Sequence, residues 1–303
     1  MNQTNQSSNQ SFTVEMALWI LIAVVALALR LARLDAAPLN GHEARQAILA
    51  WRAVTGQGMP EAGYSPLLFA ANALLFALGG ASDRLARLWP VLCGSALALT
   101  PFLFRRRIGR VGALATGLCL AFSPTLLFAS RQLDGSVIAA LSGTLFLGGV
   151  VCFFEPSIAK DEQDTTSRAW LTLAAGGLGL AVVSSSSAYG LLVALGLAWA
   201  VLAWAWPDQG VRRLWTLLRP HLNYALLVFL FGGLALATAL GWNLAGLGAV
   251  GDLLSAWIAR FGPAPNPAVS PLTLLVVYEL FILTFGIGGL VWAIWHSHRF
   301  GVL

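Results

Sequence analysis

Residues 15–34 read EMALWILIAVVALALRLARL, and this stretch decides the fold class. No charged side chain lies between Glu15 and Arg30. A helix of about 20 residues crosses the roughly 30 Å hydrocarbon layer of a bilayer, and it satisfies its own backbone hydrogen bonds there. The stretch therefore predicts a transmembrane helix that ends beside two arginines, Arg30 and Arg33.

Seven further apolar runs have a length suited to crossing a bilayer. They cover residues 85–104, 111–129, 136–154, 169–184, 189–206, 224–242 and 272–295. Another run, residues 64–80, is near the lower length limit. We expect an all-α polytopic membrane protein with about eight transmembrane helices. It would consist of a disordered polar tail over residues 1–14 and a single transmembrane domain over residues 15–303.

The composition of the whole chain agrees with this class. Its 303 residues are 58% hydrophobic and 10% charged, whereas a soluble domain carries about 25% charged residues. A chain this apolar cannot bury its side chains in the single core of a water-soluble domain. The composition therefore excludes a soluble enzyme, a disordered protein and a secreted disulfide scaffold. Cys93, Cys119 and Cys152 lie inside apolar runs and predict neither a disulfide framework nor a zinc site.

The positive charge comes almost entirely from arginine. Lys160 is the only lysine among the 18 basic residues, and the net charge is +5. No basic segment carries the interleaved aromatic residues of a nucleic-acid platform, so we expect no nucleic-acid partner and arginines that face lipid headgroups. Arg30 and Arg33 in particular are expected to extend towards the headgroups.

Three loops are expected on one side of the membrane: residues 35–84, 130–135 and 243–271. The two long loops contain helical patterns with an apolar face, which is typical of helices lying on a membrane surface. The apolar positions are Ala44, Ala47, Ile48, Trp51 and Val54 in the first loop, and Leu254, Trp257, Ile258 and Phe261 in the other.

The charge distribution alone favours a different topology. With eight spans and the N-terminus inside, ten basic residues lie inside and eight outside. If residues 64–80 also cross and the N-terminus lies outside, the split becomes fourteen inside and four outside. The positive-inside rule prefers the second arrangement. We nevertheless expect the first, on the grounds of the family resemblance given below.

Ionisable groups in or beside apolar segments are costly and point to function. Three such groups stand out: NGHEAR at residues 40–45, SRQLDG at residues 130–135, and Tyr278-Glu279 inside the last apolar run.

The order of these motifs resembles the membrane-embedded glycosyltransferases with the GT-C fold, which use polyprenyl-phosphate sugar donors. This superfamily includes protein O-mannosyltransferases, aminoarabinose transferases and the catalytic subunit of oligosaccharyltransferase, and the chain is most similar to a flippase-associated prokaryotic branch. The similarity covers roughly residues 25–155 and depends on six segments in order: RLARLD at 30–35, PLNGHEA at 38–44, YSP at 64–66, SDRLARLWP at 82–90, SP at 123–124 and SRQLD at 130–134.

The resemblance implies a sugar transfer on the non-cytoplasmic face of a prokaryotic plasma membrane. Both acidic loops would lie on that face, and residues 64–80 would lie along the membrane without crossing it. The donor would be a lipid-linked sugar, and the acceptor an envelope glycan, a lipid or a protein. A divalent metal ion is a candidate cofactor.

The resemblance also implies roles for individual residues. Glu43 would be the catalytic base and Asp134 a supporting or metal-facing acid. The residues expected to contact substrate are His42, Arg45, Tyr64, Arg87, Arg131 and Glu279, with Arg131 as the contact to the phosphate. His42 stands where the family usually has an aspartate, so a catalytically inactive flippase-associated or scaffold subunit is the alternative.

Structural interpretations of the same residues also remain open. Glu43 could be an acid favoured by a helix N-terminus, and Asp134 could cap the helix that follows it. His42 could be a solvated residue without a ligand. Glu279 could pair with an arginine, stay protonated, or line the groove for the lipid carrier.

Overall fold

The computed structural model describes residues 3–60, 63–154, 163–205, 218–261 and 277–295, and every regular element within these ranges is helical. The expected all-α class is therefore confirmed for this part of the chain. Four helical segments are long and apolar enough to cross a membrane: Val14–Leu31, Asp83–Phe122, Ser136–Phe153 and Arg219–Ala237. The expected total of about eight crossings stays a prediction.

Helix α1 (Gln3–Leu31) begins earlier than the first apolar run, so it includes most of the polar stretch expected to be disordered. It packs against α5 (Leu88–Leu99) and α6 (Arg105–Phe122). Small residues in the contact let the helices approach closely, as is common between membrane helices. A Cβ atom added at Gly117 would lie 3.0 Å from the Trp19 ring and 3.1 Å from the Ala98 carbonyl oxygen.

Two breaks interrupt the long segment that contains α5 and α6. A short 3₁₀ helix, η1 (Thr100–Phe104), leads into α6, and Gly109 then adopts φ 79° and ψ 160°, in the left-handed region that favours glycine. The apolar run 111–129, expected as one span, is divided into α6 and the short α7 (Pro124–Ser130). Proline lacks the backbone N–H that would continue α6, which explains the division.

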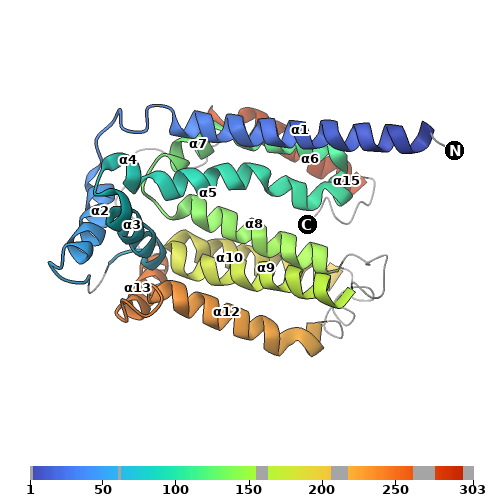
Figure 1. The fold of residues 1–303 in the computed structure, drawn as a ribbon. Coiled ribbons are helices and arrows are strands. Elements are labelled where there is room, and N and C mark those ends of the chain that lie inside the picture. Colours follow the sequence, from blue (N-terminus) through green and yellow to red (C-terminus); the bar gives the residue numbers. More distant parts are fainter. Residues whose placement is uncertain (1–2, 61–62, 155–162, 206–217, 262–276, 296–303) are drawn as a thin grey trace.

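The middle of the molecule consists of long helices that run side by side (Figure 1). They are α8 (Ser136–Phe153), α9 (Gln163–Ser184), α10 (Ser186–Ala205) and α12 (Leu222–Ala237), with η2 (Arg219–His221) before α12. A Cβ atom on Gly149 of α8 would lie 2.6 Å from the Ala174 nitrogen of α9, so the two backbones touch. The last described helix is α15 (Leu280–Trp295).

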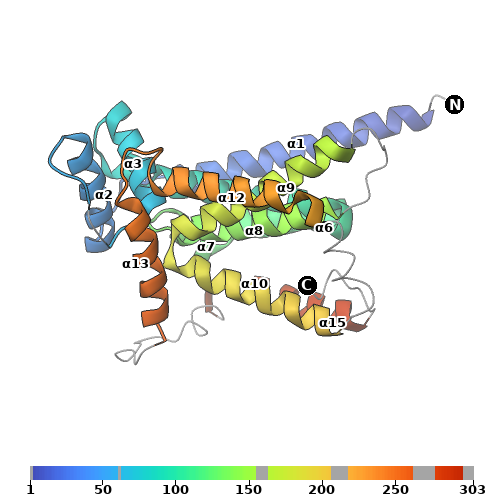
Figure 2. The same ribbon diagram turned by 90° about the horizontal axis from the view of Figure 1, so that it is seen from below.

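Shorter helices lie across one end of this bundle (Figures 1 and 2). They are α2 (Gly41–Val54), α3 (Pro66–Gly79), α4 (Asp83–Ala86) and α13 (Gly246–Ala259). Helix α3 has 14 residues, fewer than the 17–25 of a typical crossing helix. Its position across the end of the bundle agrees with a segment that does not cross.

The apolar face expected for α2 is only partly correct. Its buried side consists of Ala47, Ala50 and Ala53, which pack against α3, together with the polar Glu43 and Gln46. Ile48 and Trp51, expected on the same apolar face as Ala47, are exposed. Small alanines allow α2 and α3 to approach closely, so the larger side chains remain on the outer surface.

Candidate functional site

Glu43 lies in the first turn of α2, where it forms a capping box with Asn40. The Asn40 side chain accepts a hydrogen bond from the Glu43 backbone N–H at 2.9 Å. In return, Glu43 Oε2 accepts from the Asn40 backbone N–H at 2.9 Å. This reciprocal pair satisfies backbone groups that a helix start otherwise leaves without partners. The interpretation of Glu43 as an acid at a helix N-terminus is thus confirmed.

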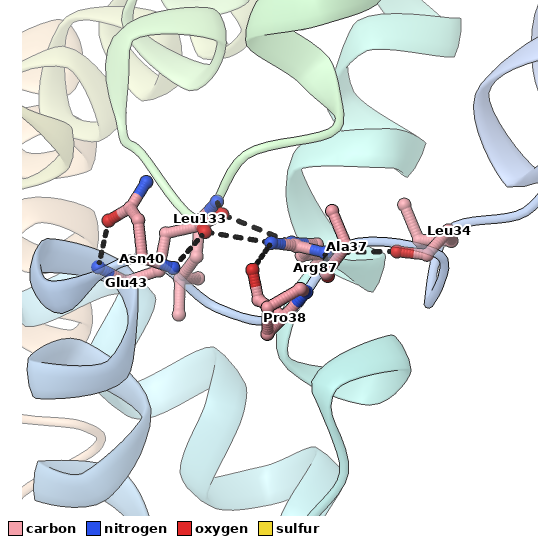
Figure 3. Close-up of polar contacts among 7 residues, drawn as sticks. All are labelled: Leu34, Ala37, Pro38, Asn40, Glu43, Arg87 and Leu133. Atoms are coloured by element: carbon pink, nitrogen blue, oxygen red, sulfur yellow. Dashed lines mark hydrogen bonds and ion pairs between the residues drawn. The ribbon is translucent and has the colours of Figure 1, made fainter.

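The same carboxylate forms a buried, two-pronged ion pair with Arg87, at the junction of α4 and α5 (Figure 3). Arg87 Nε donates to Oε1 at 3.0 Å, and Arg87 Nη2 donates to Oε2 at 2.8 Å. The backbone N–H of Leu133 also donates to Oε1, at 2.7 Å. A carboxylate offers about four lone-pair positions, so all of those on Glu43 are used.

Arg87 is equally saturated. Besides Glu43, it donates to three backbone carbonyl oxygens between the end of α1 and the start of α2 (Figure 3). These bonds reach Leu34 at 3.0 Å, Ala37 at 2.8 Å and Pro38 at 3.2 Å. A guanidinium has five N–H donors, and Arg87 makes five hydrogen bonds. Its side chain therefore fixes the loop after α1 and leaves no donor for a substrate.

These contacts determine the charge state of Glu43. Burial raises its pKa, but the hydrogen bonds from Arg87 and from the backbone of Asn40 and Leu133 outweigh burial and hold the pKa below the ordinary value. A carboxylate that is ionised, buried and fully bonded is a poor proton acceptor. The geometry thus favours a positioning role for Glu43, and its predicted role as catalytic base remains without structural support.

Asp134 has the opposite surroundings. It is half-buried on the loop before α8, one residue after the Leu133 N–H that binds Glu43. Its alternative role as a helix cap is wrong, because the N-cap of α8 is Gly135 and no side chain caps that helix. Among the described residues, the Asp134 carboxylate makes no hydrogen bond or ion pair. The two acidic loops meet as predicted: the Glu43 carboxylate is fully bonded, whereas the Asp134 carboxylate has no partner among the described residues.

Arg131, on the same loop, fixes the end of α1. Its Nη2 donates to the carbonyl oxygens of Ala32 at 2.7 Å and Arg33 at 3.0 Å. Its Nε and Nη1 donate to no other described residue, so the guanidinium retains donors for an anion. Among the arginines predicted to contact substrate, Arg131 therefore combines a fixed position with free donors.

The junction between α9 and α10 packs closely against the Asp134 loop. Ser65, the N-cap of α3, donates to the Ser184 carbonyl oxygen at 2.6 Å. The same carbonyl lies directly against Gly135, where any Cβ atom would overlap it. The loop is thus held by Glu43 on one side and by the α9–α10 junction on the other.

Arg30 corrects one expectation. It does not extend to the headgroups: it is fully buried and donates to the carbonyl oxygens of Ala26 at 3.0 Å, Leu120 at 3.2 Å and Ala121 at 3.4 Å. Its Nε also donates to the Ser130 hydroxyl at 3.0 Å. Because Pro124 has no N–H, the Leu120 carbonyl loses its helical partner, and Arg30 replaces it. Arg33 is exposed as expected.

Glu279 lies on the other side of the same helix break. Its carboxylate accepts from the Ser123 hydroxyl and from the Thr125 backbone N–H, the latter at 2.9 Å. Among the described residues, its partners are thus the first groups of α7 and not an arginine. An acidic side chain is favourable at the N-terminus of a helix, where Glu279 meets α7. A basic side chain is favourable at the C-terminus of a helix, where Arg30 meets α6. The Ser123-Pro124 pair was the signal in the sequence for this break.

The remaining predicted contact residues have less favourable positions. His42 and Arg45 are exposed on α2, so a solvated His42 is confirmed. Tyr64 is buried, and its hydroxyl accepts from the Asn243 side chain at 2.7 Å. Burial raises the pKa of Tyr64, helped by the nearby Asp252 charge and opposed by the Asn243 bond. Asn243 was missed because nothing in its local sequence predicts a distant partner.

The described residues form no cluster that would hold a metal ion by protein side chains alone. Within the described residues, no group of three or more histidine, cysteine, aspartate or glutamate side chains lies close enough to hold a metal. Glu43, which accepts a hydrogen bond from that loop, has no free lone pair. The predicted divalent ion therefore gains no support from the donor set.

Compared with protein-family models, curated proteins and solved structures, the chain matches none of them. The resemblance to GT-C glycosyltransferases therefore stays a prediction.

Proposed function

We propose that the protein is a membrane glycosyltransferase that moves a sugar from a polyprenyl-phosphate donor to an acceptor hydroxyl at the Asp134 loop. One observation carries the proposal: a half-buried carboxylate without a partner among the described residues lies on a loop that is fixed from several sides. A general base needs a free lone pair and a defined position. Asp134 has both, and Arg131, three residues earlier, has free donors for a phosphate.

The proposal includes a topology of eight crossings with the N-terminus inside. The crossing elements would be α1, α5, α6 with α7, α8, α9, α10, α12 and α15. The 2.7 Å bond from Leu133 to Glu43 supports this arrangement, because loops 35–84 and 130–135 must then lie on one side. If residues 64–80 crossed, these loops would face opposite sides. The bond thus supports eight crossings, whereas the charge count favours nine.

The proposed reaction uses the protein's own side chains. The acceptor oxygen forms a bond to the anomeric carbon while its proton moves to the Asp134 carboxylate. The bond from that carbon to the phosphate oxygen breaks, and polyprenyl phosphate leaves with the electron pair. Arg131 offsets the charge of the leaving phosphate. Glu43 and Arg87 hold the loop and touch no reacting atom.

The setting would be a prokaryotic plasma membrane with the site facing outside. The acceptor would be an envelope glycan, a lipid or a protein. Exposed apolar residues on α2 and on α13, such as Trp51 and Ile258, suit a site at the lipid–water interface, where a lipid-linked donor presents its phosphate.

The test compares single variants reconstituted in liposomes that contain polyprenyl-phosphate mannose, glucose or aminoarabinose and a membrane lipid extract as acceptor. The readout is release of polyprenyl phosphate. We expect Asp134→Asn to lower the rate at least 100-fold, because a general base contributes about 10²–10⁴. Asp134 makes no described hydrogen bond, so the thermal unfolding temperature should not change.

Asp35→Asn is the matched control. Asp35 is an exposed aspartate at the same end of the molecule, and its variant should keep the wild-type rate. Equal rates for wild type and Asp134→Asn would contradict the catalytic assignment. Equal losses in both aspartate variants would show a general charge effect and would also contradict it.

The saturated Glu43 favours a second candidate function. A family member in which the acid of the NGHEAR motif is fully bonded could serve as a scaffold or flippase-associated subunit without catalysis. In that case the wild type would release no polyprenyl phosphate from any of the three donors. It would still retain the lipid-linked donor during purification, and the retention would not depend on Asp134.

A further inference from the structure

Four of the six residues in 105–110 are arginines, and they lie far from the Asp134 loop. They adjoin Glu15, near the start of the apolar part of α1, whereas Arg30 and Arg33 lie at its other end. At 1.5 Å per residue, Glu15 and Arg30 are roughly 22 Å apart along the helix. Figure 2 shows α6 near the end of the bundle opposite α2 and α3. The arginines thus face the other side of the membrane.

One buried carboxylate holds two of these arginines in place. Arg105 Nη1 lies 3.4 Å from Glu15 Oε1, and Arg110 Nε lies 3.4 Å from Glu15 Oε2. The Arg105 guanidinium also lies 3.9 Å from the centre of the Phe102 ring, a cation–π contact. Arg110 keeps 65% of its side chain exposed. The two guanidiniums share one carboxylate, so this group of three residues carries a net positive charge in a fixed position.

Apolar side chains are exposed beside this charge. The left-handed Gly109 turns the chain between Ile108, which is 39% exposed, and Val111, which is 80% exposed. A soluble anion would gain nothing from these side chains. A ligand with an anionic head and an apolar body would contact both the arginines and the apolar pair.

We propose that the 105–110 turn, with Glu15 as its anchor, binds the phosphate of an anionic phospholipid in the membrane leaflet opposite the Asp134 loop. The guanidiniums of Arg105 and Arg110 contact the lipid phosphate. Ile108 and Val111 contact its acyl chains. This site lies away from the Asp134 loop and does not depend on the proposed glycosyltransferase activity.

The test uses the purified full chain in mild detergent, titrated separately with phosphatidylglycerol and phosphatidylcholine, and counts bound lipids by native mass spectrometry. We expect phosphatidylglycerol to bind more tightly. Each arginine near a membrane surface contributes about fivefold in affinity for anionic lipid, so Arg105→Gln with Arg110→Gln should weaken its binding roughly 10- to 30-fold. Arg110→Gln alone should lower the affinity for phosphatidylglycerol about fivefold. Arg110 is mostly exposed, so this variant should not disturb the fold.

The matched control is Arg52→Gln with Arg84→Gln, two exposed arginines at the opposite end of the molecule. It should leave the tight phosphatidylglycerol binding unchanged. The proposal is overturned if both lipids bind equally, or if the control pair loses as much affinity as the test pair. Displacement of the lipid by millimolar inorganic phosphate would also overturn it, because that result would indicate a site for soluble anions.

Discussion

Glu43 and Asp134 carry the same charge on neighbouring loops, yet their surroundings give them different roles. Glu43 accepts four hydrogen bonds and is buried, whereas Asp134 accepts none from the described residues. The sequence predicted that both residues matter and that their loops meet. It could not assign the roles, because three of the four bonds to Glu43 come from Arg87 and from the Leu133 backbone, which lie far away in the chain.

Removal of Arg87 tests the positioning role. In Arg87→Met the Glu43 charge stays buried without its partner, so we expect a loss of about 3–5 kcal/mol in the free energy of unfolding. The double variant Glu43→Met with Arg87→Met should be more stable than Arg87→Met, since it leaves no unpaired charge. Thermal unfolding in detergent measures all three proteins. A stable Arg87→Met protein would contradict the role.

The Glu43 pair also predicts a pH dependence. The pKa of Glu43 is lower in the folded protein than its ordinary value of about 4.3, so its contribution to stability is fully present above that pH. The contribution is lost as the pH falls through the folded pKa and the carboxylate is protonated. The unfolding temperature should therefore fall from about pH 4.5 downwards. Glu43→Gln should start less stable and show a shallower decline over that range.

At the scale of elements, the break between α6 and α7 shows what hydropathy can and cannot predict. Helix α8 agrees with the apolar run 136–154 to within one residue, and α9 ends at Ser184, as the run 169–184 does. Apolar runs thus predict helix boundaries here. Hydropathy does not show where an apolar run bends. It therefore missed the division at Pro124, and it placed Arg30 among the headgroups although the break offers that side chain its carbonyl partners.

A comparison of Arg30 with Arg33 tests this break. Arg30→Met would leave the Leu120 and Ala121 carbonyls and the Ser130 hydroxyl without their donor. We expect the free energy of unfolding to fall by several kcal/mol, at about 1–3 kcal/mol for each buried group left without a partner. Arg33→Met, three residues later on an exposed site, should have almost no effect. Denaturant unfolding in micelles checks both, and equal stabilities would refute the structural role of Arg30.

At the scale of the whole molecule, the loops at the α2–α3 end bind one another. Glu43 joins the first two acidic loops, Tyr64 binds Asn243, and the Gly63 backbone N–H donates to Asp252 at 3.0 Å. Loops held together in this way must share one side of the membrane. The sequence predicted that side from a family resemblance, whereas its charge count pointed to the other topology. Contacts between distant loops support the predicted topology, because each one is incompatible with an odd number of crossings between its partners.

Labelling of introduced cysteines separates the two topologies. His42, Leu240 and Arg110 are exposed, and each is changed to cysteine in a chain whose three native cysteines are replaced by alanine. With eight crossings, His42→Cys and Leu240→Cys react with a membrane-impermeant maleimide in intact cells, whereas Arg110→Cys reacts only after permeabilisation. With nine crossings, His42→Cys would instead behave like Arg110→Cys, while Leu240→Cys would still react from outside. The two patterns differ only in whether residues 64–80 cross the membrane. If His42→Cys does not react with the maleimide in intact cells, Glu43 and Asp134 lie on opposite sides of the membrane and cannot belong to one site.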